Sequence, residues 1–234
     1  MKALKKIKHR LISWLFPAQA HKQQQKKWNA KWSDPDFDPA WRISAIPQEL
    51  KDAVENEWFP AKASILDIGC GSGEVSSWLA EQGFTVLGVD IAEGAIQRAR
   101  LRNADKQDKL SFNTLDICRQ STAPKQFEVL VDRGCLHTIN PEFMPDYVKN
   151  IAASTSQGAR FLLFHKVEGK KKDSSPNLIR TSLEELQEVT IEKIKRNFQP
   201  TFEILEIKPI VLTCSSGKNP RDPMPALAIR MIRS

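Results

Sequence analysis

Cysteine and long apolar runs are both scarce in this chain of 234 residues. Four cysteines are widely spaced, form no C-x-x-C pair and do not cluster with the four histidines. This pattern argues against a disulfide framework and offers no metal-ligand set, so we expect reduced thiols, no metal ion and a cytoplasmic location. No apolar run approaches the roughly 18 residues that a transmembrane helix needs. The composition, with 41% hydrophobic and 27% charged residues, is typical of a globular protein with one sizeable core.

Acidic residues are absent from residues 1–31, which hold nine of the 35 lysines and arginines. Residues 32–234 hold the other 26 basic residues and all 28 acidic residues, so the positive net charge of +7 comes from residues 1–31. A basic body would indicate a nucleic-acid surface, whereas a basic arm indicates a tether, so nucleic acid is not the expected partner. We predict two units: a basic arm with a linker over 1–31, and a folded domain over 32–234.

The arm has apolar residues at helical spacing, namely Leu4, Ile7, Leu11, Trp14 and Leu15. Basic residues lie among them, as in an amphipathic helix that contacts an anionic membrane surface or an acidic partner. Two alternatives stay open: the helix packs on the domain or frays in solvent, or the segment is a cleaved secretion signal. The apolar stretch 11–16 is shorter than the 7–15 residues usual in a signal. Residues 21–31, rich in Gln and Lys, are predicted to be a linker.

From Ser64 onward the pattern alternates between strands and helices, which predicts an α/β fold with a parallel sheet. The expected strands are Ser64–Ile68, Thr85–Val89, Leu110–Thr114, Glu128–Val131 and Arg160–His165. The expected helices are Glu74–Gln82, Glu93–Asn103, Phe143–Ser154 and Ser182–Asn197. Two further strands, Phe202–Thr213 and Ala226–Ile232, have no helix between them and predict an antiparallel hairpin. The expectation is a seven-stranded mixed sheet with helices on both faces.

The segment Ile65–Gly73 reads ILDIGCGSG, an apolar strand that ends in three glycines at alternate positions. Glycine is needed where the chain turns sharply and a ligand approaches the backbone. The segment therefore predicts a strand, a glycine loop and a helix that together bind a nucleotide-like cofactor. A dinucleotide site has the spacing G-x-G-x-x-G, but here Glu74 replaces the third glycine. Glu74 and Asp67 are expected to repel a diphosphate, which favours a cationic, phosphate-free cofactor such as S-adenosylmethionine over NAD.

Two acidic residues follow later strands. Asp90 lies at the end of the second strand, 21 residues after Gly69, where a carboxylate can accept both ribose hydroxyls. The alternative for Asp90 is a cap on the helix that begins near Ala92. Asp116, after the third strand, is placed to contact the adenine amino group, with Ile117 against the ring; the alternative is a loop acid that caps nothing.

Four segments together resemble the motifs of class I S-adenosylmethionine-dependent methyltransferases: Ile65–Gly73, Val89–Asp90, Leu115–Asp116 and Val129–His137. The resemblance spans roughly residues 47–233 and implies an enzyme with a Rossmann-like sheet whose last strand is antiparallel. It implies S-adenosyl-L-methionine as the cofactor. The cofactor-binding residues that it implies are Asp67, Gly69, Cys70, Gly71, Gly73, Asp90, Ile91, Asp116, Ile117 and Asp132.

The segment after the fourth strand bears on the methyl acceptor. It lacks the Asn/Asp-Pro-Pro-aromatic motif, which argues against DNA adenine and protein glutamine as substrates. The run Asp132–Gly134, followed by Ile139–Pro141, is similar to the thiopurine and thiol methyltransferase branch. That resemblance implies catalytic roles for Asp132, Arg133 and His137, and a cover of cofactor and substrate by Trp32 and Trp41.

Methyl transfer from a sulfonium depends on positioning and desolvation, and a thiol acceptor needs little more than a route for its proton. We therefore expect a small-molecule acceptor, with a thiol or another soft nucleophile as the leading candidate. The alternative is an RNA or protein methyltransferase that uses the basic arm to hold its substrate. Two residues keep a non-catalytic interpretation: His137 as a helix-start histidine and Cys135 as a packing residue.

Overall fold

The computed structural model describes residues 17–39, 41–43, 45–105, 108–123, 126–167, 182–213 and 224–234. The amphipathic helix expected at 4–15 lies outside these residues. The helices are α2 (Pro17–Trp32), α3 (Gln48–Glu55), α4 (Glu74–Glu81), α5 (Glu93–Arg102), α6 (Met144–Ala153), α7 (Leu183–Phe198) and the 3-10 turns η1 (Leu136–Thr138) and η2 (Pro141–Phe143). The strands are β1 (Ser64–Ile68), β2 (Thr85–Asp90), β3 (Leu110–Thr114), β4 (Phe127–Arg133), β5 (Thr155–Lys166), β6 (Phe202–Leu212) and β7 (Met224–Arg233). In the ranges described, no helix has the length and apolar character of a membrane span.

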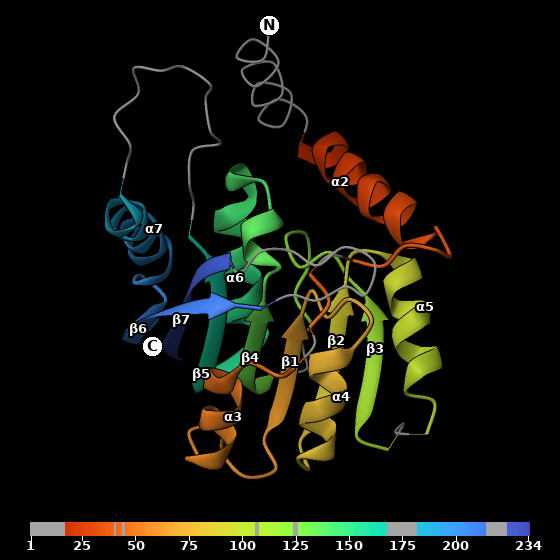
Figure 1. Ribbon diagram of the computed structural model, residues 1–234, viewed down its shortest axis with the longest axis horizontal. Helices are drawn as coiled ribbons and strands as arrows, with labels where there is room; N and C mark the ends of the chain where they lie inside the picture. The colour runs from red at the N-terminus through yellow and green to blue at the C-terminus, as the bar shows by residue number, and fades with distance from the viewer. Residues whose placement is uncertain are drawn as a thin grey trace, which may run out of the picture.

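The strands form one mixed sheet in the order β3-β2-β1-β4-β5-β7-β6 (Figure 1). The first five are parallel to one another, and β7 runs antiparallel to both β5 and β6. The predicted Rossmann-like sheet with a C-terminal antiparallel hairpin is confirmed. The chain steps outward from β1 to β3 on one side and from β4 to β5 on the other. Such a switch point, at the carboxyl ends of β1 and β4, is where open α/β sheets bind ligands.

The sheet separates two apolar layers because successive strand residues point to opposite faces. In β1, Leu66 and Ile68 face a cluster that includes residues of α6 and α7, whereas Ile65 faces a cluster that includes residues of α3, α4 and α5. Figure 1 shows these helices on the two sides of the sheet. Each fully buried large side chain contributes about 1.5–3 kcal/mol, so the two layers stabilise the sheet that carries the site.

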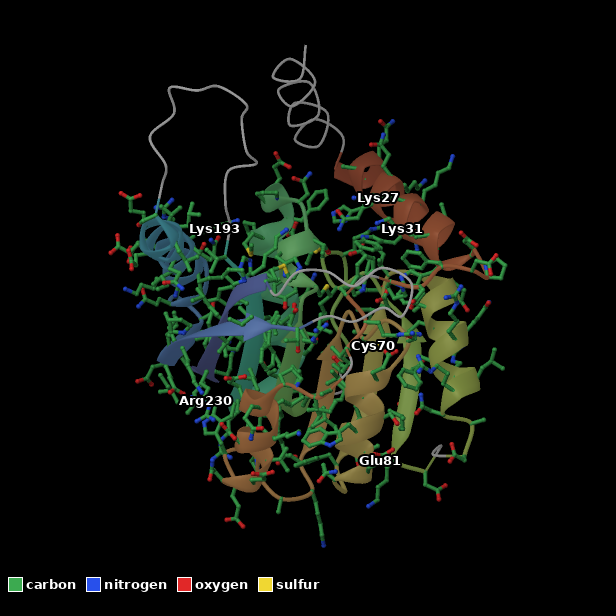
Figure 2. All side chains as sticks on the ribbon, viewed as in Figure 1. Lys27, Lys31, Cys70, Glu81, Lys193 and Arg230 are labelled. Carbon is green, nitrogen blue, oxygen red and sulfur yellow. The ribbon has the colours of Figure 1, made fainter. Side chains whose placement is uncertain are left out.

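Helix α2 is the main departure from the sequence-based expectation. Residues 21–31, predicted as a linker, lie within this helix, so that interpretation is wrong and the boundary between 31 and 32 falls inside an element. Asn29 Oδ1 accepts a hydrogen bond of 2.9 Å from the Glu93 amide at the start of α5. Trp32 is buried beside Ala92 and Ala95. Figure 2 places Lys27 and Lys31 on this helix.

Candidate active site

The glycine loop between β1 and α4 is fixed to the end of β2. The amides of Gly69 and Cys70 donate to the Val89 carbonyl at 2.7 and 3.0 Å, and the Gly71 amide donates to Asp90 Oδ2 at 3.1 Å. Gly69, Gly71 and Gly73 have φ of +67°, +56° and +83°, a region that strongly favours glycine. A Cβ on Gly69 would lie 2.5 Å from the Cys135 Cβ. The loop therefore needs its glycines for both conformation and space.

Asp90 and Asp116 hold the turns that follow β2 and β3. Asp90 Oδ1 accepts from the Ala92 amide at 2.9 Å, so the residue does cap this turn, and it lines the cavity as well. Asp116 Oδ1 accepts from the Cys118 amide at 3.0 Å, and Oδ2 lies 3.1 Å from His21 Nδ1. A carboxylate oxygen has a second lone pair, so these contacts leave acceptor capacity. Burial raises the pKa of Asp90 to about 6. This value is still below 7, so the carboxylate is mainly ionised at neutral pH.

Asp132, predicted as a catalytic and cofactor-binding residue, lies behind the cavity wall. It is fully buried and accepts hydrogen bonds from the Cys135 amide at 2.7 Å, the Leu136 amide at 3.0 Å and the Tyr147 hydroxyl at 2.7 Å. Burial raises the pKa of Asp132 to about 6. Because Asp132 does not line the cavity, its role in the structure is to fix the turn that follows Arg133.

Arg133 and His137 flank that turn and line the cavity. Arg133 Nη1 donates to the Trp41 carbonyl at 2.9 Å, which ties β4 to the aromatic segment. The His137 ring stands edge-on to His165, with 5.8 Å between centroids. His137 Nδ1 is buried and has no hydrogen-bond partner among the residues that the structure describes. Burial, with the charges of His165, Lys166 and Arg133, lowers the pKa of His137 to about 3, so the ring is neutral at neutral pH.

One cavity of about 240 Å³ lies at the carboxyl edge of the sheet, close to the lower end of the ~300–1,000 Å³ common for small-molecule sites. Ten predicted site residues line it: Trp32, Trp41, Gly69, Gly71, Asp90, Ile91, Asp116, Ile117, Arg133 and His137. Asp67 and Cys70 instead line an adjoining cavity of about 60 Å³. Gly73 and Asp132 line neither. A Cβ on Gly73 would lie 2.7 Å from the Phe112 ring, so this glycine serves packing.

Several residues that line the cavity were not predicted from the sequence. Gln24 and Trp28 reach it from α2, and Lys166, Leu212 and Met224 reach it from the three C-terminal strands. Trp28 stands four residues before Trp32, a spacing that places both on one face of a helix. That signal was present in the segment interpreted as a linker. Lys166 ends the apolar run of β5, and the carboxyl end of a parallel strand was the clue to its position.

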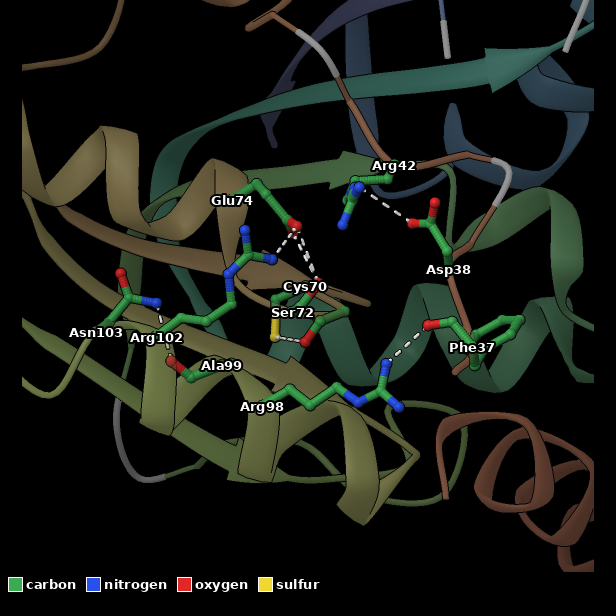
Figure 3. A network of polar contacts seen from close by, with 11 residues as sticks. Phe37, Asp38, Arg42, Cys70, Ser72, Glu74, Arg98, Ala99, Arg102 and Asn103 are labelled. Atoms are coloured by element: carbon green, nitrogen blue, oxygen red, sulfur yellow. Dashed lines mark hydrogen bonds and ion pairs between the residues drawn. The ribbon is translucent and has the colours of Figure 1, made fainter. Parts of the chain in front are cut away.

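The charge of Glu74 is more strongly offset than the sequence indicates. Figure 3 shows its carboxylate between the Arg102 guanidinium, at 2.6 Å, and the Ser72 hydroxyl, at 2.9 Å. Asp67, buried against the Ser76 hydroxyl at 2.5 Å, has its pKa raised by burial to about 7, so it is only partly ionised at neutral pH. The expected repulsion of a diphosphate is therefore weaker, and the case against a dinucleotide rests mainly on the glycine spacing.

The cradle fits S-adenosylmethionine on geometric grounds. Asp90 offers carboxylate oxygens for the ribose hydroxyls, and Asp116 does so for the adenine amino group. Ile117 supplies an apolar surface beside Asp116, and Gly71 exposes backbone where a Cβ would meet only the Trp32 ring, at 3.5 Å. Fold and site together define an α/β domain with a cavity suited to a nucleoside cofactor at the carboxyl edge of its sheet.

Comparison with known families identifies this domain further. Residues 65–158 match a family model described as a methyltransferase domain. One curated relative is 2-heptyl-1-hydroxyquinolin-4(1H)-one methyltransferase of Mycobacteroides abscessus, 28% identical over 149 residues, which are 60% of this chain and 65% of that protein. The chain spans about half to two thirds of the length of the first curated relatives that it matches.

Solved structures show the same fold. A protein from a study entitled "Conversion of a Disulfide Bond into a Thioacetal Group during Echinomycin Biosynthesis" superposes with a TM-score of 0.73 at 19% identity, over 90% of this chain and 92% of that one. The N-methyltransferase NodS of Bradyrhizobium japonicum, in complex with S-adenosyl-L-homocysteine, superposes with a TM-score of 0.62 at 16% identity, over 90% and 98% of the two chains. Residues 65–158 thus match a methyltransferase domain, and the chain shares the fold of a solved methyltransferase that binds S-adenosyl-L-homocysteine.

Proposed function

We propose that the chain transfers the methyl group of S-adenosylmethionine to a small-molecule acceptor, with a thiol or another soft nucleophile as the leading candidate. One observation carries the proposal. The cavity that begins at Gly71 and Asp90 continues past Arg133 and His137 beneath tryptophans of the N-terminal segment. We therefore assign the cofactor and acceptor sites to one continuous cavity. The hydroxyquinolone named for the M. abscessus relative, a small heterocycle, supports an acceptor of this size.

When bound, S-adenosylmethionine supplies a methyl group on a positively charged sulfur. The chain contributes position and exclusion of water, the two effects on which such a displacement depends. The glycine loop and Asp90 fix the cofactor end. Trp41, whose backbone carbonyl accepts from Arg133, covers the other end, and its ring meets the Trp28 ring of α2 edge-on at 5.6 Å between centroids.

No strong base faces the acceptor among the described residues that line the cavity. His137 stays neutral with its pKa lowered to about 3, so it takes up a proton poorly. The pKa of the Cys135 thiol is raised well above its usual value by burial, which keeps the thiol protonated and agrees with a packing role against Gly69. An acceptor that loses its proton readily suits this site, and a thiol does so more easily than an alcohol.

The first test is calorimetric titration with S-adenosylhomocysteine. We expect saturable binding to the full chain, weakened at least tenfold in Asp90→Asn because that carboxylate is the proposed ribose acceptor. Asp105→Asn, an exposed carboxylate just after α5, is the matched control. No binding at high micromolar ligand would rule out the proposal.

The second test is methyl transfer from labelled cofactor to a panel of thiols, phenols, bulk RNA and protein. Turnover of the small molecules supports the proposal. If RNA or protein is methylated instead, with a dependence on residues 1–31 and on salt, the macromolecular alternative is correct.

A further inference from the structure

The two ends of the cavity carry opposite charge. Asp90 and Asp116 line it at the ends of β2 and β3, whereas Arg133 and Lys166 line it at the ends of β4 and β5. Because β1 separates these strand pairs in the sheet, the acids and the bases occupy different halves of the cavity. The acidic half is the one assigned to the cofactor. The basic half faces whatever receives the methyl group.

The basic half brings two cations to one wall, and no acidic side chain among the described residues lines that half. Lys166 ends β5 within this wall. The Arg133 guanidinium donates to the neutral Trp41 carbonyl, which orients it. Asp132, the nearest acid in sequence, faces away toward Tyr147. The wall therefore presents positive charge to the acceptor side of the cavity.

We propose that the acceptor binds as an anion, with its ionised sulfur or oxygen between Arg133 and Lys166 and a flat apolar body against Trp41. This inference rests on the proposed function and names the substrate class for the same site. A cation beside an acidic group favours its ionised form and lowers its pKa by roughly 1–3 units. The site would therefore ionise the acceptor on binding, without a general base.

The chemistry balances without proton transfer in the bond-forming step. The acceptor anion forms a bond to the methyl carbon while the bond between that carbon and the sulfonium breaks, and the bonding electron pair stays on the departing sulfur. An anion and a cation thus become two neutral products. The acceptor proton leaves to solvent before this step, so the neutral His137 with its buried Nδ1 need not accept it.

The groups that face the acceptor determine how its binding depends on pH. His137 comes from η1, Lys166 from β5 and Arg133 from β4, while the buried His165 of β5 lies against the His137 ring and does not line the cavity. Asp90 and Asp116 lie at the opposite end. Because the low pKa of His137 keeps that ring neutral near pH 7, the experiment follows the ionisation of the acceptor itself.

The experiment uses 4-nitrothiophenol and 4-nitrophenol, whose anions absorb visible light and whose neutral forms do not. Each is titrated into the full chain saturated with S-adenosylhomocysteine, at a pH one unit below the pKa of free 4-nitrophenol, where 4-nitrothiophenol is already ionised in solution. We expect one or both to bind and to appear as the anion, with the pKa of bound 4-nitrophenol lowered by about one unit or more. The two probes distinguish a sulfur from an oxygen acceptor. Probes that bind only in neutral form, or do not bind, overturn the inference.

A matched set of variants assigns the effect. Lys166→Met should reduce affinity for the anion about tenfold and lose most of its pKa shift, whereas Lys166→Arg should retain both. Lys149→Met, an exposed lysine of α6 away from the cavity, is the control. Affinity for S-adenosylhomocysteine should be the same in all four proteins. If the wild-type chain does not bind S-adenosylhomocysteine, the proposed function fails; if it does and Lys166→Met still binds the anion normally, only this inference fails.

Discussion

The glycines of the loop differ in what their missing side chain provides. Gly71 leaves backbone open toward the cavity, because its nearest neighbour is the Trp32 ring at 3.5 Å. Gly69 and Gly73 instead allow close packing, against Cys135 and Phe112 respectively. The sequence pattern predicts all three as cofactor contacts. It cannot separate contact from packing, since the opposing residues are far away in the chain.

The same difficulty applies to the acids. Asp90 was placed correctly at the cavity because the end of a parallel strand defines its position. Asp132 also lies near the end of a parallel strand, yet its carboxylate accepts from the amides of Cys135 and Leu136 and from the Tyr147 hydroxyl of α6. Sequence gives the strand end but not the direction of the side chain, which the facing helix determines.

Substitution of Gly69 tests the packing role. We expect Gly69→Ala to lower the free energy of unfolding by about 2–5 kcal/mol, from a left-handed φ and from overlap with Cys135. Gly83→Ala is the control, because its φ of +95° carries the conformational cost but no atom lies within 4 Å of the added Cβ. It should lose only about 1–2 kcal/mol. Equal losses in urea unfolding would show that the contact with Cys135 has no cost.

Asp67 should make stability depend on pH. Burial raises its pKa in the folded state from 3.8 to about 7, so the folded chain keeps a proton that the unfolded chain has lost. Stability from this group is complete below about pH 4 and falls as pH rises toward 7, by on the order of 4 kcal/mol. Asp67→Asn, which cannot ionise and can still accept from Ser76, should flatten this slope. The comparison is urea unfolding of both proteins at pH 5 and 7.5; parallel slopes would contradict the assignment.

Helix α2 shows why an element can be misread. Its residues are polar, with four lysines between 22 and 31, and a polar segment without a continuous apolar stripe is typical of a linker. The helix is held by distant partners instead: Asp116 beside His21, Phe143 stacked on His21 at 3.7 Å, and the start of α5. Only the spacing of Trp28 and Trp32 indicated a helix from sequence.

Because α2 forms part of the cavity wall, we expect a substitution on its cavity side to weaken ligand binding more than it lowers stability. Trp28 is half-buried and lines the cavity, so Trp28→Ala should weaken acceptor or cofactor binding about tenfold, from lost contact area. Trp58→Ala is the control, since Trp58 does not line the cavity and its ring instead packs against Arg230. Calorimetry on both variants decides: unchanged binding in Trp28→Ala would mean that the helix only lies beside the site.

At the scale of the whole molecule, the alternating strands and helices predicted the sheet, because short apolar runs and their connections define parallel βαβ units. The hairpin was also predicted. What the pattern could not provide was the cover: Gln24 and Trp28 from the N-terminal side, and Leu212 and Met224 from the C-terminal side, converge on one cavity. These residues are close in space but far apart in sequence, so no periodic pattern in the sequence relates them.

A shortened chain, residues 17–234, tests whether the cavity and the positive charge of residues 1–16 act independently. Residues 1–16 hold five lysines and arginines and no acid, so their removal lowers the formal net charge from +7 to +2 and leaves α2 intact. We expect the shortened chain to bind S-adenosylhomocysteine with the affinity of the full chain, since every described wall residue remains. We propose that residues 1–16 bind anionic membranes, so the full chain should bind phosphatidylglycerol vesicles and the shortened chain should not, because each lysine or arginine near an anionic surface contributes about 1 kcal/mol. Co-sedimentation at low and high salt measures this, with phosphatidylcholine vesicles as the control. Equal sedimentation of both chains, or sedimentation of neither, would rule out a membrane contact through residues 1–16.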